Sequence, residues 1–375
     1  MKRLGNIWTD VIDEDFAVSA LVDGVKHKKH QKSVQKLLND DHTVNLEKAR
    51  EYVRPIIEDL KNGTYTPGDP ICKRRLCKNK SNKGKWRDLY VPSLRDHVVH
   101  HMLIQASIKA FTRGMHPFCC GSVPGRGIKW ILKYVEKWVR YDKRSVYFVK
   151  LDIKHFFDNI NPEILKRKLS EKIKDKKVLK VFNKIIDSSP TACPIGFYTS
   201  PWFANLYLEK FDWYVVQNFN IRHYLRYMDD MLLISHCKRL LEKLIGYLKK
   251  HLHDELGLEI KNSWEIKAIG RHRIIGGEYT MLRGTDWLDI GGYKFCKDAT
   301  ILRDGIFLST KREVKKRAYS LRWCRSVNSV LGWASHSDSH NFTNKYVKPY
   351  VNIKRIKRVI RNVDKNRKWR KYSTA

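Results

Sequence analysis

Two adjacent acids, Asp229 and Asp230, lie in the segment 221–235, which reads IRHYLRYMDDMLLIS. Apolar, β-branched and aromatic residues flank the acids on both sides, which predicts two short strands joined by a tight turn with the acids at its tip. Neighbouring carboxylates repel each other, and a divalent cation such as Mg²⁺ relieves that repulsion because it prefers hard oxygen ligands. Asp also favours turns on its own account, so this motif alone fits a surface turn as well.

A third acid, Asp152, follows the stretch SVYFVKL at 145–151. We expect Val146, Phe148 and Leu151 to belong to a buried strand that ends at Asp152. A carboxylate at a strand end and a hairpin with two more supply the ligands of two-metal phosphoryl transfer. In that chemistry one ion activates an attacking hydroxyl and the other stabilises the leaving pyrophosphate.

The charge of the whole chain indicates a polyanionic partner. Its 375 residues include 75 Lys and Arg against 39 Asp and Glu, a formal net charge of +36 at pH 7. Such an excess suits phosphate contacts on a nucleic acid, with a merely solvated basic surface as the alternative. A content of 42% hydrophobic residues, with 11 Trp, 18 Tyr and 14 Phe, favours a folded enzyme of two or three subdomains over a basic tail protein.

The cysteine pattern and the apolar runs exclude other classes. No CxxC pair occurs among the eight cysteines, which disfavours a zinc site. Scattered thiols without a signal peptide indicate a reduced, cytoplasmic setting. No apolar run approaches the ~20 residues of a membrane span, so we expect no membrane partner.

The acidic motifs resemble those of reverse transcriptases. Asp152 matches the first catalytic aspartate of that family, and Tyr227–Asp230 matches its YxDD box. The resemblance spans roughly residues 60–350 and implies an α+β, right-hand polymerase fold with fingers, an antiparallel palm sheet and a helical thumb. It divides the chain into an N-terminal helical extension (1–70), fingers (71–145), a palm (146–280, with fingers elements at 160–192), and a thumb with a basic tail (281–375).

The resemblance also implies the chemistry of the site. Asp152 and Asp229 would bind two Mg²⁺ ions, for which Mn²⁺ can substitute, with Asp230 in support and the backbone carbonyl of Ile153 completing one shell. A primer hydroxyl would then attack the α-phosphate of a dNTP in line. Phe157 would stack under the sugar and exclude a 2′-hydroxyl, with a core aromatic as the alternative.

Residues 71–92 read as a strand, a Lys/Asn/Gly turn and a second strand, with many basic side chains. A basic hairpin above a metal site can clamp a triphosphate, whereas a solvated basic turn is the alternative. By resemblance, Arg87 with Lys78 or Lys85 would contact the phosphates of the incoming nucleotide.

Two other arginines lie in segments that resemble family motifs. Arg95 lies near the start of a predicted helix over 93–113 and is expected to contact nucleic acid. Arg126, in GSVPGRG before a second predicted helix, matches an arginine near the template or nucleotide, and a turn that caps the helix is compatible with this. Three histidines of the first helix are interpreted as residues of a polar helix face rather than as metal ligands: His97, His100 and His101.

Gly196, followed by Ser200-Pro201, matches the family's fourth motif, where a glycine permits close approach of the backbone to the nucleotide or templating base. Most reverse transcriptases have Gln before this glycine, but this chain has Ile195. A branched apolar residue there resembles the enzymes of diversity-generating retroelements, which mutagenise while copying and usually continue with Ser-Gln. Without an amide near the base pair, we expect weaker discrimination between bases.

The last third of the chain supplies further expected contacts. Lys261 resembles a residue of the motif that closes on the nucleotide and is a candidate general acid toward pyrophosphate, or a strand-edge lysine. Segment 274–279 lies where the family has a primer-grip hairpin, and segment 25–37 is predicted to be helical. We expect nucleic-acid contacts from two residues of the YxDD box and four of the basic thumb: Tyr227, Met228, Lys311, Arg312, Lys315 and Lys316.

The implied partners are an RNA template with a DNA or RNA primer, dNTPs and, for the retroelement type, a small basic accessory protein. The implied setting is the cytoplasm of a bacterium, with the gene bacterial or phage-encoded. Two other functions stay open: a reverse transcriptase of phage defence, and a catalytically silent RNA-binding scaffold on the same fold. The intact acids disfavour the scaffold.

Overall fold

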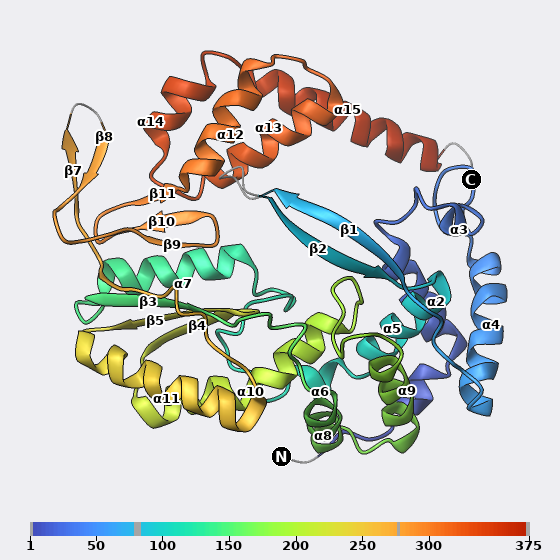
Figure 1. Cartoon of the computed structure of the whole chain (residues 1–375). Helices are drawn as coiled ribbons and strands as arrows, with labels where there is room; N and C mark the ends of the chain where they lie inside the picture. Colours follow the sequence, from blue (N-terminus) through green and yellow to red (C-terminus); the bar gives the residue numbers. More distant parts are fainter. Residues whose placement is uncertain (1–2, 79–83, 276–277, 373–375) are drawn as a thin grey trace.

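The computed structural model describes residues 3–78, 84–275 and 278–372, and Figure 1 shows their arrangement. A four-stranded sheet, the palm sheet, has the order β4-β5-β3-β6 with every neighbouring pair antiparallel. Its strands are β3 (Tyr147–Asp152), β4 (His223–Tyr227), β5 (Asp230–Ser235) and β6 (Ile266–Ala268). The predicted α+β fold, the hairpin with its acidic turn and the strand that ends at Asp152 are confirmed.

Side chains of the palm sheet alternate between two apolar cores, because successive residues of a strand point to opposite faces. Met231 and Leu233 of β5 belong to the first core, and Leu232 and Ile234 belong to the second. The prediction that Val146 is part of the buried strand is wrong: its side chain is 36% exposed, because β3 starts one residue later.

The first core joins the palm sheet to the fingers and to the N-terminal helices (Figure 1). On the palm it contains side chains of α10 (Ser200–Phe219) and α11 (Lys238–Leu256). Its other helices are α1 (Ile7–Val11), α2 (Glu14–Val25), α3 (Lys32–Gln35), α4 (Leu46–Asn62), α5 (Leu94–Ala106), α6 (Ile108–Thr112), α8 (Pro162–Lys172) and α9 (Lys176–Asp187). The predicted boundary at residue 70 therefore divides segments that share one core, and it stays a prediction, as do the other domain limits.

The fingers hairpin consists of β1 (Ile71–Lys78) and β2 (Gly84–Val91), as predicted. The strands are antiparallel, with Ile71 opposite Val91 and Lys78 opposite Gly84. In Figure 1 the hairpin rises from the helices of the fingers toward the thumb. The turn at 79–83 lies outside the described residues.

The second core joins the opposite face of the palm sheet to the thumb. It is built on α7 (Ile128–Tyr141), a small sheet and the thumb helices, all of which lie above the palm sheet in Figure 1. The small sheet is β9 (Leu288–Ile290), β10 (Tyr293–Phe295) and β11 (Thr300–Leu302), preceded by the hairpin β7 (His272–Ile275) and β8 (Glu278–Met281). The thumb has α12 (Asp304–Lys315), α13 (Leu321–Ala334), α14 (His340–Phe342), a π-helical turn (Thr343–Val347) and α15 (Ile353–Tyr372). Within the described ranges, no helix has both the length and the apolar composition for crossing a membrane.

Two further local predictions are wrong. The helix predicted over 25–37 is only the four-residue α3, because the chain between α2 and α3 forms short-range turns where many like charges would crowd one helix. The three histidines of α5 are buried, not on a polar face. His101 stacks on Tyr198 with ring centroids 3.6 Å apart, and burial lowers the pKa of His100 to about 3, so these rings are neutral packing groups.

Candidate active site

The acid turn, defined here as residues 227–230, lies beside the end of β3. Tyr227 pairs with Asp230 across the hairpin, and Met228 and Asp229 form its two-residue turn. Met228 has a φ of 56°, a left-handed conformation that a side chain with a Cβ rarely adopts. Asp230 is also the cross-strand partner of Asp152, and the backbone nitrogen of Ile153 donates to the carbonyl of Asp229 at 3.3 Å. Asp152 and Asp230 therefore lie directly opposite each other on adjacent strands, with Asp229 next to Asp230 in the chain.

The electrostatics of the acid turn disfavour three bare negative charges. Burial by the surrounding protein, together with the charge of Asp152, raises the pKa of Asp229 above its usual value. Burial and the charge of Asp152 likewise raise the pKa of Asp230. The Lys261 ammonium lies 2.5 Å from Oδ1 of Asp152 and offsets part of this charge. The backbone nitrogen of Lys261 also donates to the carbonyl of Asp152, at 2.8 Å.

A divalent cation fits the chemistry of these donors. Carboxylate oxygens are the ligands that Mg²⁺ prefers, and sites that act on phosphates hold it through one or two carboxylates plus water and substrate oxygens. Among the described residues, no three or more His, Cys, Asp or Glu side chains are placed so that they could hold a metal ion by themselves. An ion beside the acid turn would therefore need oxygen ligands from water and substrate phosphate in addition to the carboxylates.

The fingers hairpin places like charges opposite each other. Arg75 and Arg87 are cross-strand partners, and both are exposed. Directly opposed like charges destabilise a hairpin unless an anion lies between or above them. This arrangement favours the predicted phosphate role of Arg87. Lys78 and Lys85 lie on the same strands, but their side chains are outside the described part of the structure.

The loop at 194–199 is attached to the end of β2. The carbonyl of Ile195 accepts a hydrogen bond from the Tyr90 nitrogen at 2.8 Å, and the Ile195 side chain is half-buried. Gly196 has a φ of 119°, and a Cβ there would lie 2.4 Å from the carbonyl oxygen of Tyr90. The close approach that requires glycine is therefore to the fingers backbone, a contact that the sequence did not indicate.

Three other predicted residues have internal partners. Arg95 forms an ion pair with Asp59 at 2.6 Å and stacks over Tyr65, and the Arg126 guanidinium donates to the carbonyl of His116 at 2.9 Å. Phe157 is half-buried, with its ring centroid 5.4 Å from that of Phe156. Their expected contacts with nucleotide or nucleic acid stay predictions.

The predicted basic residues of the thumb lie on or just after α12. Lys311 and Lys315 sit over the rings of Tyr346 and Tyr350, at 4.7 and 5.7 Å from the centroids. Lys316 pairs with Glu313 at 2.8 Å, and Arg312 is exposed. The first two lysines thus cover tyrosine rings while their charges remain at the surface.

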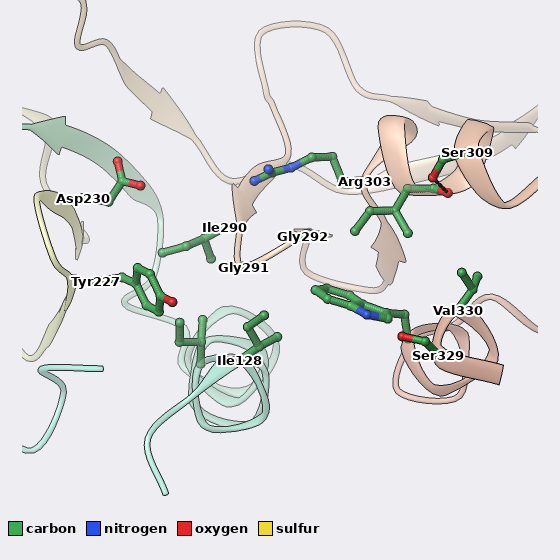
Figure 2. Close-up of a pocket in the computed structure, with 13 residues that line it drawn as sticks. Ile128, Tyr227, Asp230, Ile290, Gly291, Gly292, Arg303, Ser309, Ser329 and Val330 are labelled. Atoms are coloured by element: carbon green, nitrogen blue, oxygen red, sulfur yellow. Dashed lines mark hydrogen bonds between the residues drawn. The ribbon is translucent and has the colours of Figure 1, made fainter. Parts of the chain in front are cut away.

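A cavity of about 540 Å³ connects the acid turn with the thumb. Figure 2 shows Tyr227 and Asp230 on one side and Ser329 and Val330 of α13 on the other. The turn between β9 and β10 and the side chain of Arg303 form another part of its wall. Sequence patterns did not indicate Arg303, whose guanidinium pairs with Asp289. Of the three acids, Asp230 therefore lines a space whose walls come from both the palm and the thumb.

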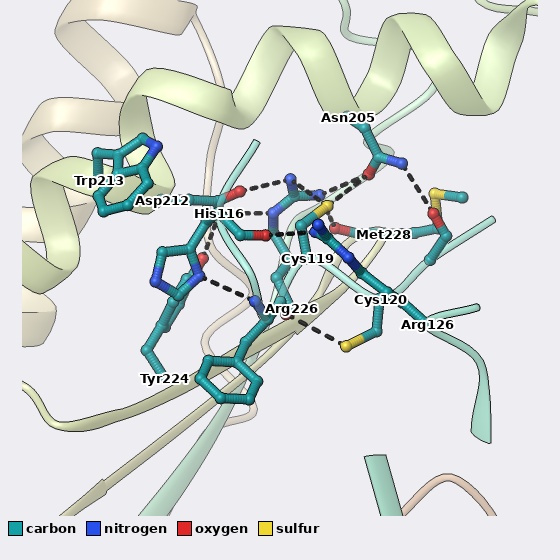
Figure 3. Close-up of polar contacts among 12 residues, drawn as sticks. His116, Cys119, Cys120, Arg126, Asn205, Asp212, Trp213, Tyr224, Arg226 and Met228 are labelled. Atoms are coloured by element: carbon teal, nitrogen blue, oxygen red, sulfur yellow. Dashed lines mark hydrogen bonds and ion pairs between the residues drawn. The ribbon is translucent and has the colours of Figure 1, made fainter. Parts of the chain in front are cut away.

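A second feature that sequence patterns missed is a buried ion pair behind the acid turn. Arg226 and Asp212 both have fully buried side chains and are linked by hydrogen bonds of 2.7 Å (Figure 3). Arg226 directly precedes the YxDD box, but its partner belongs to α10.

Comparison with known families identifies the domain that holds this site. Residues 77–263 match the family described as reverse transcriptase (RNA-dependent DNA polymerase). This stretch contains the three acids, the second strand of the fingers hairpin and the loop at 194–199. The chain therefore carries a reverse transcriptase domain.

Its curated relatives include proteins of bacterial retroelements. The group II intron-encoded protein LtrA of Lactococcus lactis subsp. cremoris is 29% identical over 179 residues, which are 45% of this chain and 29% of LtrA. The retron Ec73 reverse transcriptase of Escherichia coli is 24% identical over 304 residues, 75% of this chain and 89% of that protein. The chain thus spans less than a third of LtrA. A solved structure of apo telomerase from Candida tropicalis, truncated from its C-terminal domain, is 13% identical, covering 68% of this chain and 60% of that one. Its TM-score of 0.43 is too low to support an argument.

Proposed function

We propose that this protein is an RNA-directed DNA polymerase that makes cDNA by two-metal nucleotidyl transfer. The observation that carries the proposal is the pairing of Asp152 with Asp230 beside the turn at Asp229, inside a reverse transcriptase domain. The substrates are dNTPs, with an RNA template and a DNA or RNA primer as partners. The reaction takes place in the cytoplasm of a bacterial cell.

The three acids are the residues that would hold the metal ions. When bound, two Mg²⁺ ions supply an activated primer hydroxyl and neutralise the charge on the leaving pyrophosphate. Asp152 and Asp229 would ligate them, Asp230 would support the site, and the Ile153 carbonyl would provide a further oxygen. Reverse transcriptases generally use divalent metal ions, and Mn²⁺ is the expected substitute.

The remaining residues bind and orient the substrates. Arg87, with Lys78 or Lys85, holds the triphosphate, and Lys261 moves from Asp152 toward the phosphates to protonate the pyrophosphate. Phe157 packs under the sugar, and Arg126 and Gly196 lie near the template or nucleotide. Arg95, Tyr227 and Met228 contact the nucleic acid together with the basic residues of the thumb: Lys311, Arg312, Lys315 and Lys316.

The first prediction tests the acids. Asp152→Asn and Asp229→Asn remove one ligand charge each, and we expect primer extension on an RNA template with Mg²⁺ to fall by at least about 10³-fold, since charge stabilisation carries most of the barrier reduction. RNA binding, measured by fluorescence anisotropy, should stay within about twofold, because phosphate contacts dominate affinity.

The matched control is Asp254→Asn, an exposed acid on α11, which should extend primers like the wild type. Wild-type rates for either Asp152 or Asp229 variant would end the catalytic assignment. Lack of extension by the wild type, with RNA binding intact, would favour the RNA-binding scaffold.

Within this activity, we propose an error-prone enzyme of the diversity-generating retroelement type, acting with a small basic accessory protein. The support is Ile195, an apolar side chain on the loop at 194–199. A phage-defence reverse transcriptase is the second candidate, since such an enzyme would share the same palm residues.

The second prediction concerns fidelity. Ile195→Gln restores an amide that can hydrogen-bond near the base pair, so misincorporation should fall, most visibly opposite template adenine, by about tenfold. Sequencing of cDNA copied from a defined RNA measures this, with Ile195→Val as the apolar control. Equal error spectra for the Gln variant and the wild type would remove the mutagenic assignment without affecting the polymerase assignment.

A further inference from the structure

The guanidinium of Arg226 donates hydrogen bonds to several neighbouring residues (Figure 3). Its Nε and one terminal nitrogen form two 2.7 Å bonds to Asp212, and that terminal nitrogen also donates to Sγ of Cys119 at 3.2 Å. The other terminal nitrogen donates to the side-chain oxygen of Asn205 at 3.2 Å and to the carbonyl of Met228 at 3.0 Å. All five N–H donors of a guanidinium therefore have an acceptor.

The hydrogen bond to Met228 reaches the acid turn itself. Met228 holds the left-handed backbone conformation at the peptide that leads into Asp229. Such a conformation persists only where the surrounding structure determines it. The carbonyl of Met228 is thus fixed from behind by a charged donor, and charge-assisted hydrogen bonds are the stronger and more directional kind.

The acid turn is confined from a second direction by Gly121. A Cβ at this glycine would lie 2.8 Å from the backbone nitrogen of Met228, so only glycine fits. The carbonyl of Gly121 accepts from the Asn205 amide at 2.7 Å, and the Cys120 nitrogen donates to the carbonyl of Arg226 at 2.8 Å. One connected network therefore holds both sides of the turn.

A buried ion pair by itself does not explain this arrangement, because apolar residues of similar volume often stabilise a fold equally well. The pair anchors a guanidinium that also donates to the carbonyl of Met228, the left-handed residue directly before Asp229. Asp212 is also held, since it accepts from the hydroxyl of Tyr224 at 2.6 Å.

We propose that Arg226 is a positioning residue: supported by Asp212 and Asn205, it fixes the Met228 peptide and thereby the direction in which Asp229 and Asp230 present their carboxylates to metal. This inference rests on the proposed polymerase function. It assigns the buried pair a role in metal placement that is separate from its contribution to stability.

The test is the double variant Arg226→Met with Asp212→Asn, which removes both charges, keeps their approximate volumes and leaves an acceptor for Tyr224. Thermal melting shows whether it folds. Because a displacement of about 1 Å can reduce a rate about 100-fold, we expect the kcat for single-nucleotide addition to fall at least about tenfold. The KM for dNTP should change by less than about twofold, since the groups that bind the nucleotide are intact.

A second readout does not depend on turnover. Binding of Mn²⁺ alone, followed by the loss of its free electron paramagnetic resonance signal, should weaken at least about fivefold, because displaced carboxylates ligate poorly. Asp229→Asn gives the reference for a damaged site. A folded double variant with wild-type kcat and Mn²⁺ affinity would overturn the proposal and leave the pair purely structural.

If the double variant does not fold, Gly121→Ala displaces the acid turn from the other side without touching the ion pair, and the same two losses are expected. Gly246→Ala, at an exposed helical glycine with open space around it, is the matched control. Unchanged Mn²⁺ binding by a folded Gly121→Ala variant would contradict the proposal. If the wild type does not extend primers, the polymerase assignment fails, and the Mn²⁺ measurement still decides the positioning role.

Discussion

The acids of the turn carry a free-energy cost of their own. Burial first, and the charge of Asp152 second, raise the pKa of Asp229, so the folded protein holds this carboxylate less well than water does. A group whose pKa is raised by folding makes the ionised protein less stable. That loss is complete above the folded pKa and disappears as the pH falls below the unfolded value, near 3.8.

The third prediction follows from the raised pKa of Asp229. In metal-free buffer near pH 7, Asp229→Asn should raise the Tm on the order of 2 °C, because it removes a poorly solvated charge. The gain should shrink as the pH approaches about 3, and Mg²⁺ should raise the Tm of the wild type more than that of the variant. Scanning fluorimetry over this pH range measures both effects. A gain that does not depend on pH would point to packing instead.

The sequence pattern reveals the acids but not the buried ion pair behind them. Asp229 and Asp230 are adjacent and lie between two apolar runs, so the pattern is local. Arg226 gave no signal, because its partner Asp212 lies fourteen positions away on a helix, and only the fold brings the two together.

At the scale of elements, the junction between fingers and palm depends on one backbone contact. The loop at 194–199 meets the end of β2 through Tyr90 and Gly196. The Tyr90 carbonyl leaves no room for a Cβ at Gly196, and a φ of 119° disfavours any other residue there. A resemblance to the fourth motif predicted a glycine that approaches the substrate. The structure gives this glycine a partner in the protein, which a single sequence does not reveal.

The fourth prediction compares two glycines. Gly196→Ala should destabilise the protein by about 2 kcal/mol, because the backbone is strained and the Cβ meets the Tyr90 carbonyl. Gly246→Ala on α11 should stabilise it by about 0.5–1 kcal/mol, because alanine is the better helix former at an exposed site. Urea denaturation of both variants gives the free energies of unfolding. Equal effects of the two substitutions would contradict the close contact at Gly196.

Elements with strong patterns were predictable and those with conflicting ones were not. The two strands of the fingers hairpin follow directly from the sequence. The segment 25–37 fails because helical propensity there competes with like charges, and the helix expected over 93–113 is interrupted at the buried Ser107, where α5 ends and α6 begins. No periodicity marks that break.

At the scale of the whole molecule, the net charge of +36 would dominate encounters with the proposed nucleic-acid partner. Exposed Arg312 and Lys316 on the thumb contribute to it, while Lys311 and Lys315 also lie over tyrosine rings. A duplex held between palm and thumb would therefore bind mainly through its phosphates, independently of sequence.

The fifth prediction is a salt dependence. The affinity for an RNA–DNA duplex should fall about 10³-fold between about 50 and 200 mM salt, as for six or more phosphate contacts. Arg312→Gln with Lys316→Gln should lower the slope of log affinity against log salt by about two. Lys243→Gln with Lys250→Gln, exposed on α11, is the matched control. If only the substitutions on α11 lowered the salt slope, the duplex would bind near α11 rather than on the thumb.

The palm sheet separates two apolar cores, and this has a consequence for how the protein can change. Leu232 packs in the core on the thumb side of the sheet, and its neighbour Leu233 packs in the core on the fingers side. The side chains at adjacent positions of one strand therefore have to fit packing partners from opposite ends of the chain. Loss of the thumb would expose one apolar face of this sheet to solvent, so neither half of the protein would fold as an independent domain. Replacing the thumb with that of another protein would require matching changes at every second residue of the palm strands.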